Sequence, residues 1–184
     1  MDPYHPRKKA GDMEDQLILV DMNDNAIGSA GKLETHVQGR LHRAFSLFVI
    51  SDGRMLIHRR ADGKYHSGGL WTNAVCSHPR AGEELEDAVV RRSKQELGLM
   101  LDTCPPEVFD FIYRTDFGEL SEYEYDHVFL LQTKEPPVLE PNPEEIGAVE
   151  WVALDELSQR LLTHPETFTT WFITAAPKVI SLAR

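Results

Sequence analysis

The sequence predicts an α+β fold in which a mixed or antiparallel sheet packs between helices. Strand-like and helical segments follow one another irregularly, and the regular strand–helix alternation of a parallel sheet is absent. The length of 184 residues suits one domain with a sizeable core. No repeat or break in composition divides the chain. We therefore expect a polar N-terminal leader over residues 1–15 and a single domain over residues 16–184.

The strand-like segments are short runs rich in apolar and β-branched residues, bounded by turn signals. The turn at Asp52-Gly53 separates two of them, and this dipeptide is typical of a tight hairpin. After this hairpin comes a glycine-rich loop. The predicted strands are residues 16–22, 44–51, 54–60, 107–117, 122–133 and 148–153.

The clearest predicted helix covers residues 83–97. Glu83 and Glu84 favour its N-terminus electrostatically, and Gly98 suits its C-terminal cap. Residues 154–162 and 166–175 are also expected to be helical.

Two charged residues lie on the apolar side of the helix predicted at residues 83–97. At about 100° per residue, Arg92 and Glu96 fall within roughly 20° of Leu85. One interpretation is an ion pair between positions i and i+4 at the margin of the core. The other is that this face lines a site, where Glu96 holds a cation and Arg92 an anionic group.

Composition excludes several classes of function. The net charge of −11 disfavours binding to nucleic acid or to anionic membranes. No apolar run reaches the roughly 18 to 20 residues of a membrane span, and residues 1–15 do not resemble a secretory signal. The two cysteines, Cys76 and Cys104, do not make a disulfide framework. A reducing cytoplasm is the expected location.

Potential metal ligands occur in three places along the chain. Glu122 and Glu124 share one face of a strand, where two like charges repel unless a cation lies between them. Taken alone, each feature favours an ordinary explanation, which is a solvated strand end for the glutamates and a satisfied polar group for a histidine. Together they form a mixed nitrogen and oxygen set that suits Zn²⁺, Mn²⁺ or Mg²⁺ without selecting one. The set is His36, His42, His78, Glu122 and Glu124, and the nearby cations are Lys32, Arg60, Lys64 and Arg92.

In their order along the chain, these motifs resemble the type I isopentenyl-diphosphate Δ-isomerases of the Nudix superfamily. Residues 71–79 (WTNAVCSHP) resemble the cysteine signature T-N-x-x-C-x-H-P, and residues 122–124 resemble the glutamate motif. Arg91-Arg92 followed by Glu96-Leu97-Gly98 resembles the R-R…E-L-G helix. The resemblance covers roughly residues 16–175 and implies a Nudix fold.

The helix departs from the pattern of Nudix hydrolases, whose several glutamates bind metal. Ser77 replaces the first glycine of that pattern, and Arg92 and Gln95 replace two of the glutamates, while Glu96 remains. The resemblance therefore implies a protein that holds a diphosphate without cleaving it.

The implied reaction is the interconversion of isopentenyl and dimethylallyl diphosphate by a 1,3-allylic proton shift. The resemblance assigns the proton transfers to Cys76 and Glu124 and favours Glu124 as the donor, although the sequence does not settle this. It implies that Tyr113 hydrogen-bonds this glutamate and that Trp171 faces the carbocation.

The resemblance also implies two metal sites. One Mg²⁺ would bridge Glu96 and the diphosphate, and a second ion (Mn²⁺, Zn²⁺ or Mg²⁺) would occupy the His/Glu site. The countercharge for the phosphates is expected from Lys32, Arg60, Lys64 and Arg92. A small-molecule substrate and a monomer or weak homodimer are expected.

Two alternatives remain at this point. One is a Nudix diphosphohydrolase that cleaves a nucleotide or prenyl diphosphate, and the other is a non-catalytic Nudix module that binds a phosphorylated ligand. Neither needs the pair Cys76 and Glu124, and Arg92 and Gln95 argue against the hydrolase.

Overall fold

The computed structural model describes residues 16–64 and 66–184. The leader expected at residues 1–15 lies outside them, and the single domain stays a prediction. The strands are β1 (Gln16–Val20), β2 (Ala26–Gly31), β3 (His42–Ser51), β4 (Arg54–Arg60), β5 (Trp71–Thr72), β6 (Val75–Ser77), β7 (Glu107–Phe117), β8 (Leu120–Thr133) and β9 (Ile146–Ala153). The helices are α1 (Lys32–Gln38), α2 (Leu85–Leu97), α3 (Leu154–Thr163) and α4 (Thr170–Leu182), with a 3₁₀ turn η1 (Pro165–Thr167).

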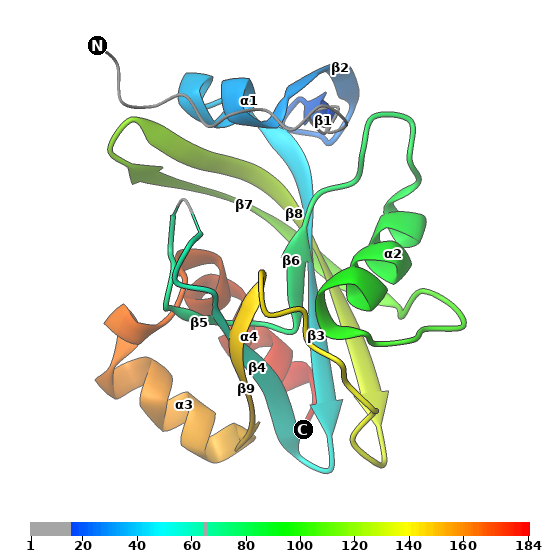
Figure 1. Cartoon of the computed structure of the whole chain (residues 1–184), viewed down its shortest axis with the longest axis vertical. Coiled ribbons are helices and arrows are strands. Elements are labelled where there is room, and N and C mark those ends of the chain that lie inside the picture. The colour runs from blue at the N-terminus through cyan, green and yellow to red at the C-terminus, as the bar shows by residue number, and fades with distance from the viewer. Residues whose placement is uncertain (1–15, 65) are drawn as a thin grey trace.

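Strand β3 organises the sheet (Figure 1). Along its whole length it pairs in parallel with β8, and β7 pairs with the far edge of β8 in the antiparallel sense. The other edge of β3 pairs antiparallel with β1, then β6, then β4. Strands β5 and β9 join β4, and β2 joins β1. The sheet is therefore mixed, as predicted.

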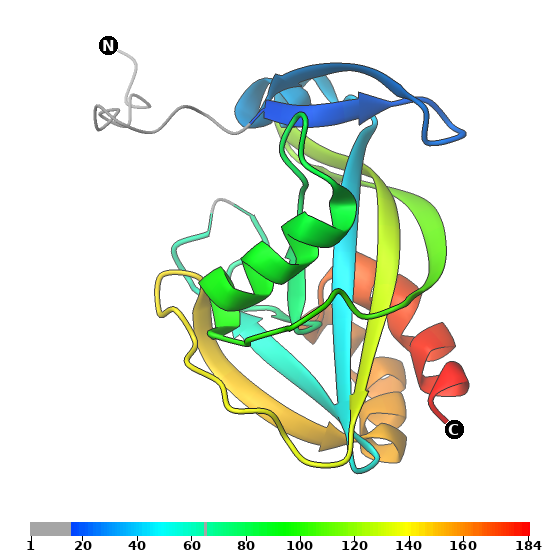
Figure 2. The same cartoon turned by 90° about the vertical axis from the view of Figure 1, so that its right-hand side faces the viewer.

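The alternation of side chains along β3 builds two hydrophobic cores. Phe48 and Ile50 point into the core shared with α3 and α4, whereas Leu47 and Val49 point into the core shared with α2. Figures 1 and 2 show α2 on one side of β3 and the C-terminal helices on the other. Full burial of each such side chain stabilises the fold by about 1.5–3 kcal/mol. The prediction of a sheet between helices is confirmed.

The hairpin between β3 and β4 is also confirmed. Ile50 pairs with Met55 and Ser51 with Arg54 across the turn. Asp52 and Gly53 both have positive φ values, 47° and 69°. A two-residue turn of this kind requires left-handed backbone at both positions, which aspartate tolerates and glycine adopts freely.

The sequence did not predict β2, α1, β5, β6 or η1, and the first two are the longest of these elements. Apart from the exposed Ile27, strand β2 consists of small residues, and it is mostly exposed, so it lacks the β-branched pattern of a strand. In α1 the usual pattern is inverted. Its apolar residues Leu33 and Val37 are 61% and 56% exposed, while Thr35 and His36 are buried. Periodicity could not detect this helix because its polar face is the inner one.

Two helix boundaries differ from the prediction. Helix α2 begins at Leu85 because Glu83 instead accepts hydrogen bonds from Arg91 and from the Arg80 backbone. The helix predicted at residues 166–175 is observed as α4 (Thr170–Leu182). Thr169 before it is extended and donates its backbone N–H to the Trp71 carbonyl. The helix continues past Pro177, and burial of apolar side chains beyond it offsets the cost of a proline.

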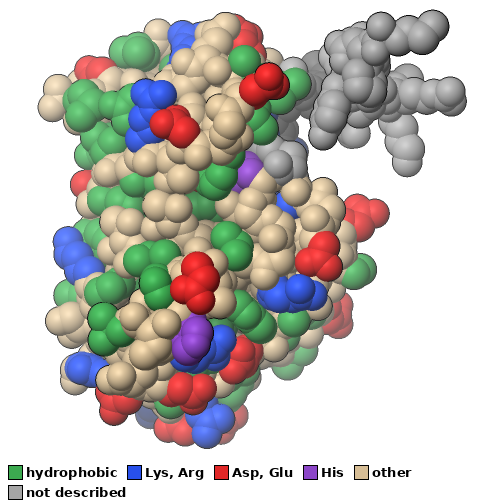
Figure 3. Space-filling model, turned by 90° about the vertical axis from the view of Figure 1, so that its left-hand side faces the viewer, with side chains coloured by type: hydrophobic (Ala, Val, Ile, Leu, Met, Phe, Trp, Pro, Cys, Tyr) green, Lys and Arg blue, Asp and Glu red, His purple; other side chains and the backbone are tan. Residues whose placement is uncertain are grey.

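The surface of the described residues carries charges of both signs. On the face shown in Figure 3, acidic and basic side chains are interspersed with hydrophobic ones. Within residues 16–64 and 66–184, no helix is long and apolar enough to span a bilayer.

Candidate active site

A cavity of about 60 Å³ collects most of the predicted site residues. It lies where the strands around β3 meet helices α1, α2 and α4. The predicted residues that line it are Lys32, Arg60, Lys64, Cys76, His78, Arg92, Glu96, Tyr113, Glu122, Glu124 and Trp171. The remaining two, His36 and His42, lie behind His78, with ring centroids 5.8 and 5.0 Å from that of His78.

At one end of the cavity, three histidines and a carboxylate converge. One ligand atom from each of His36, His42, His78 and Glu124 lies within 4.8 Å of the others. His78 Nε2 is 2.8 Å from Glu124 Oε1 and 3.2 Å from His42 Nε2. We call these four residues the histidine end.

Backbone carbonyls orient two of these imidazoles. The Nδ1–H of His36 donates to the Lys32 carbonyl at 2.7 Å, and that of His42 donates to the Arg40 carbonyl at 2.9 Å. This assignment of tautomers leaves the Nε2 lone pairs directed at the cluster, which is the arrangement that fixes histidine ligands of metals. Helix α1 contributes because it places His36 one turn after Lys32.

The electrostatics of the histidine end suit a divalent cation. Burial lowers the pKa of His36 to about 4 and that of His78 to about 3, so both rings are neutral at pH 7. Burial alone would raise the pKa of Glu124, but the His42 and His78 rings beside its carboxylate hold that pKa well below the usual value. Three imidazoles with one carboxylate form a donor set that fits Zn²⁺ or Mn²⁺.

The fifth predicted ligand, Glu122, lies beside this group and not within it. Its carboxylate is 2.9 Å from His66 Nε2 and 3.1 Å from the Tyr113 hydroxyl. His66 is buried, and the sequence analysis assigned it no role. It lies in the glycine-rich loop, which carries no periodic pattern that could indicate an inward direction.

The proposed proton-transfer residues lie on strands that flank β3. Cys76 on β6 is opposite Ser46, and Glu124 on β8 is opposite His42. Burial raises the pKa of Cys76 to about 12, although Arg60 opposes this, so the thiol keeps its proton. The Tyr113 hydroxyl donates to Glu124 Oε2 at 2.6 Å, as the resemblance implied.

Trp171 forms one wall of the cavity and is held by a buried amide. Its indole N–H donates to Asn73 Oδ1 at 3.2 Å, and the Asn73 amide nitrogen bonds the carbonyls of Leu47 and Val75. The guanidinium of Arg60 lies 5.4 Å from the Trp171 ring centroid. This face of the ring therefore already holds a cation. Asn73 was part of the recognised motif, but the sequence alone did not show its positioning role.

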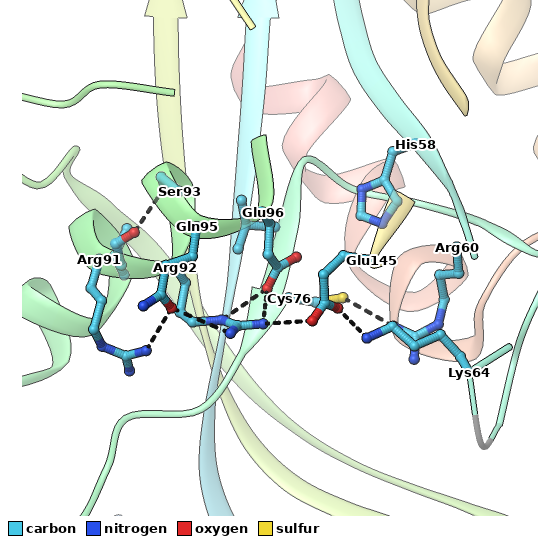
Figure 4. A network of polar contacts seen from close by, with 12 residues as sticks. His58, Arg60, Lys64, Cys76, Arg91, Arg92, Ser93, Gln95, Glu96 and Glu145 are labelled. Carbon is cyan, nitrogen blue, oxygen red and sulfur yellow. Dashed lines mark hydrogen bonds and ion pairs between the residues drawn. The ribbon is translucent and has the colours of Figure 1, made fainter. Parts of the chain in front are cut away.

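The opposite end of the cavity contains charges that neutralise one another (Figure 4). Arg92 Nη2 is 2.5 Å from Glu96 Oε1 and 3.8 Å from Glu145 Oε1. Lys64 forms an ion pair with the other oxygen of Glu145. We call these four residues the ion-pair end. Arg92 and Glu96 are therefore an i,i+4 ion pair that also lines the cavity. That Glu96 holds a cation and Arg92 an anionic group stays a prediction.

Glu96 is 4% exposed, and burial raises its pKa while Arg92 opposes the rise. Carboxylate oxygens are the kind of ligand that Mg²⁺ prefers in proteins. Glu145, which follows the proline-rich loop, was missed because nothing in its local sequence distinguishes it from its neighbour Glu144.

Comparison with known proteins agrees with the fold. The NUDIX domain family model matches residues 40–172. A crystal structure of DR0079 from Deinococcus radiodurans superposes with a TM-score of 0.69 at 20% identity, over 89% of this chain and 98% of that one. A MutT NUDIX hydrolase from Burkholderia pseudomallei gives a TM-score of 0.57 at 22% identity, over 76% and 98%. At these identities the likeness concerns the fold alone.

Sequence relatives are more informative. The chain is 49% identical to isopentenyl-diphosphate Delta-isomerase 2 of Aromatoleum aromaticum, over 92% of this chain and 88% of that protein. It is 46% identical to isopentenyl-diphosphate Delta-isomerase 2 of Photorhabdus laumondii, over 87% and 89%. In each comparison, the similarity extends over nearly the full length of both sequences. The chain therefore belongs to the isopentenyl-diphosphate Delta-isomerase family of NUDIX-domain proteins.

Proposed function

We propose that this protein is a metal-dependent isomerase that interconverts isopentenyl diphosphate and dimethylallyl diphosphate in isoprenoid biosynthesis. The observation that carries the proposal is that Cys76, Glu124 and Trp171 line one cavity whose far end is rich in cations. The names of the relatives support the same reaction.

The chemistry makes four demands on such a cavity. An unactivated alkene is a weak base, and its protonation creates a tertiary carbocation. The protein must offer an acid and a base to the carbon chain and must fix the diphosphate so that they are aligned. It must also exclude water, which would trap the cation, and must stabilise positive charge without a strong nucleophile.

Cys76 and Glu124 meet the first demand. Because the reaction is reversible, each is the acid in one direction and the base in the other. In the metal-free protein the transferable proton rests on Cys76, since burial keeps the thiol protonated and histidine hydrogen bonds keep Glu124 ionised. The assignment of Glu124 as the donor toward isopentenyl diphosphate stays a prediction.

Trp171 meets the demand for charge stabilisation. A cation over an indole face gains about 2 kcal/mol or more when it is desolvated. The ring offers π-electron density and no lone pair that could capture the carbocation. Its contact with the Arg60 guanidinium supports this role.

Divalent ions fit both ends of the cavity. His36, His42, His78 and Glu124 would hold one ion, with Glu122 beside them, and Glu96 would hold Mg²⁺ against the diphosphate. When bound, such ions supply fixed positive charge that orients Glu124 and offsets the phosphate charge. Burial keeps His36 and His78 neutral, and the rings beside Glu124 keep that carboxylate ionised.

Cations at the mouth would anchor the diphosphate. A second cavity of about 210 Å³ adjoins the first, and Lys32, Lys64 and Arg92 line both. The inner cavity, of about 60 Å³, is smaller than the roughly 150 Å³ cavity that accommodates benzene in an engineered protein core. The inner cavity therefore widens when it takes up a five-carbon chain.

A diphosphohydrolase is the weaker candidate. Hydrolysis of this type uses several helical carboxylates for metal, and here the side chain of Arg92 pairs with the one that remains, Glu96. We also expect a reducing cytoplasm, where the free thiols of Cys76 and Cys104 persist, and a monomer or weak homodimer.

Incubation with isopentenyl diphosphate and Mg²⁺ in D₂O tests the function. Deuterium should enter the allylic product, because the proton that is added comes from exchangeable protein groups. Release of phosphate without an allylic product would instead indicate a hydrolase and would sink the proposal.

A further inference from the structure

Glu145 is a carboxylate inside a site built for anions. Its Oε2 pairs with Lys64, and its Oε1 lies 3.8 Å from Arg92. Figure 4 shows Glu145 between the two cations that the proposed function gives to the diphosphate. The carboxylate therefore occupies charges that the substrate would use.

Glu145 lines the second cavity, of about 210 Å³, which we call the mouth cavity. The lining of the mouth cavity includes five cationic side chains, Lys32, Lys64, Arg80, Arg91 and Arg92. Among the described residues that line it, Glu145 is the single carboxylate. Glu145 also lines the inner cavity, so it stands where the two cavities join.

The attachment of Glu145 allows the side chain to move while the backbone stays. Its carbonyl accepts a hydrogen bond from the Ala61 N–H at 2.9 Å, and its N–H donates to the Asn142 carbonyl at 3.0 Å. The side chain is 25% exposed and faces the mouth. Rotation about side-chain bonds can carry the carboxylate away without disturbing β9.

We propose that Glu145 is a placeholder for the diphosphate, a carboxylate that neutralises Lys64 and Arg92 in the empty pocket and is displaced when the diphosphate binds. The inference rests on the proposed function. Without such a countercharge, the two half-buried cations would face one another with less compensation and would repel. With it, every anion that enters must first break the pairs that Glu145 makes.

The charge state of Glu145 agrees with this role. Burial alone would raise the pKa of Glu145, but Lys64 and Arg92 hold that pKa below its usual value, so the carboxylate is ionised at neutral pH.

Calorimetric titration with inorganic diphosphate, with and without Mg²⁺, tests the proposal. Glu145→Gln removes the competing charge and keeps the shape, so diphosphate should bind about tenfold more tightly under both conditions. The matched control is Glu144→Gln, which makes the same change at the exposed neighbouring position and should leave affinity unchanged. Unchanged or weaker binding by Glu145→Gln would overturn the placeholder.

A double-mutant cycle separates displacement from a general field effect. Lys64→Gln alone should weaken binding, and Glu145→Gln should gain less in the Lys64→Gln background than in the wild type. An equal gain in both backgrounds would show that Glu145 acts only through the overall field, which contradicts the placeholder.

Turnover of isopentenyl diphosphate by the wild type is measured alongside. If the wild type binds diphosphate and isomerises its substrate while Glu145→Gln gains nothing, the placeholder fails and the function stands. If the wild type neither binds diphosphate nor isomerises, both fail.

Discussion

The two ends of the pocket hold charge in different ways. At the histidine end, burial keeps His36 and His78 uncharged beside the ionised Glu124, and one ligand atom from each of the four residues already converges. At the ion-pair end, two cations and two carboxylates satisfy one another directly. The first is arranged to receive a cation, and the second is filled by the protein's own charges.

This difference teaches how one small cavity can serve two kinds of ligand. A preorganised site binds its ion with little rearrangement, which suits a group that stays through many turnovers. A self-neutralised site must exchange partners, which suits a substrate that enters and leaves. The following predictions test whether the two ends are separate in this way.

The largest effect is expected from the carboxylate that links the histidine end to the reaction. Glu124→Gln removes a proton-transfer group and a ligand, so kcat should fall by roughly 10²–10⁴. The measurement is turnover of isopentenyl diphosphate, with the exposed Glu119→Gln as the control for a carboxylate-to-amide change. Turnover near that of the wild type would remove Glu124 from the proton-transfer pair.

The second effect separates the two ends by their metal content. His78→Asn removes one converging ligand. Metal affinity should therefore fall by more than the 10- to 100-fold that is typical when a residue that only supports a ligand is lost. After dialysis, metal analysis should show that this variant has lost its resident ion. Arg92→Gln, at the other end, should keep the ion and raise KM instead. Equal metal loss in both variants would break the distinction.

A smaller effect is expected at the wall between the ends. Trp171→Phe keeps an aromatic face but weakens it and removes the hydrogen bond to Asn73, so kcat should fall about tenfold. Trp151→Phe, made in the other core, controls for loss of an indole. If kcat is unchanged while thermal stability falls, Trp171 is a packing residue only.

Much of this contrast was readable from the sequence. Arg92 and Glu96 stood out because charges at i and i+4 shared a face with Leu85, and the structure confirms that they line the cavity. Helix periodicity is a local property, so it survives without knowledge of the fold. The β3–β4 hairpin was predictable for the same reason, since Asp52 and Gly53 determine their own turn.

Other parts could not be read because they depend on long-range packing. Glu145 and Lys64 form an ion pair although they are 81 positions apart in the chain. His66, which contacts Glu122, lies in a loop without periodicity. Helix α1 was hidden because its apolar residues face outward and its histidine faces inward. Such elements are specified by what they cover in the fold, so local patterns do not indicate them.

The smallest effect concerns stability, and it follows from how the histidine end is kept neutral. Burial lowers the pKa of His36 and His58 to about 4 and that of His78 to about 3. Between these values and about 6.5, the unfolded chain binds more protons than the folded one. The stability that these neutral histidines contribute to the metal-free protein is therefore fully present well above pH 6.5 and is lost as the pH falls toward 4.

Each of these histidines should cost less than about 1 kcal/mol between pH 7 and pH 6. Urea unfolding of the protein freed of metal by a chelator measures this loss. His58→Gln should reduce the slope of the unfolding free energy against pH. The exposed His164→Gln should not change the slope. Divalent metal should raise the free energy of unfolding by a similar amount at pH 7 and pH 6, because His36 and His78 already carry no proton in the folded protein at either pH. Metal that adds no stability to the wild type, or adds as much to His78→Asn, would mean that the histidine end does not hold the ion.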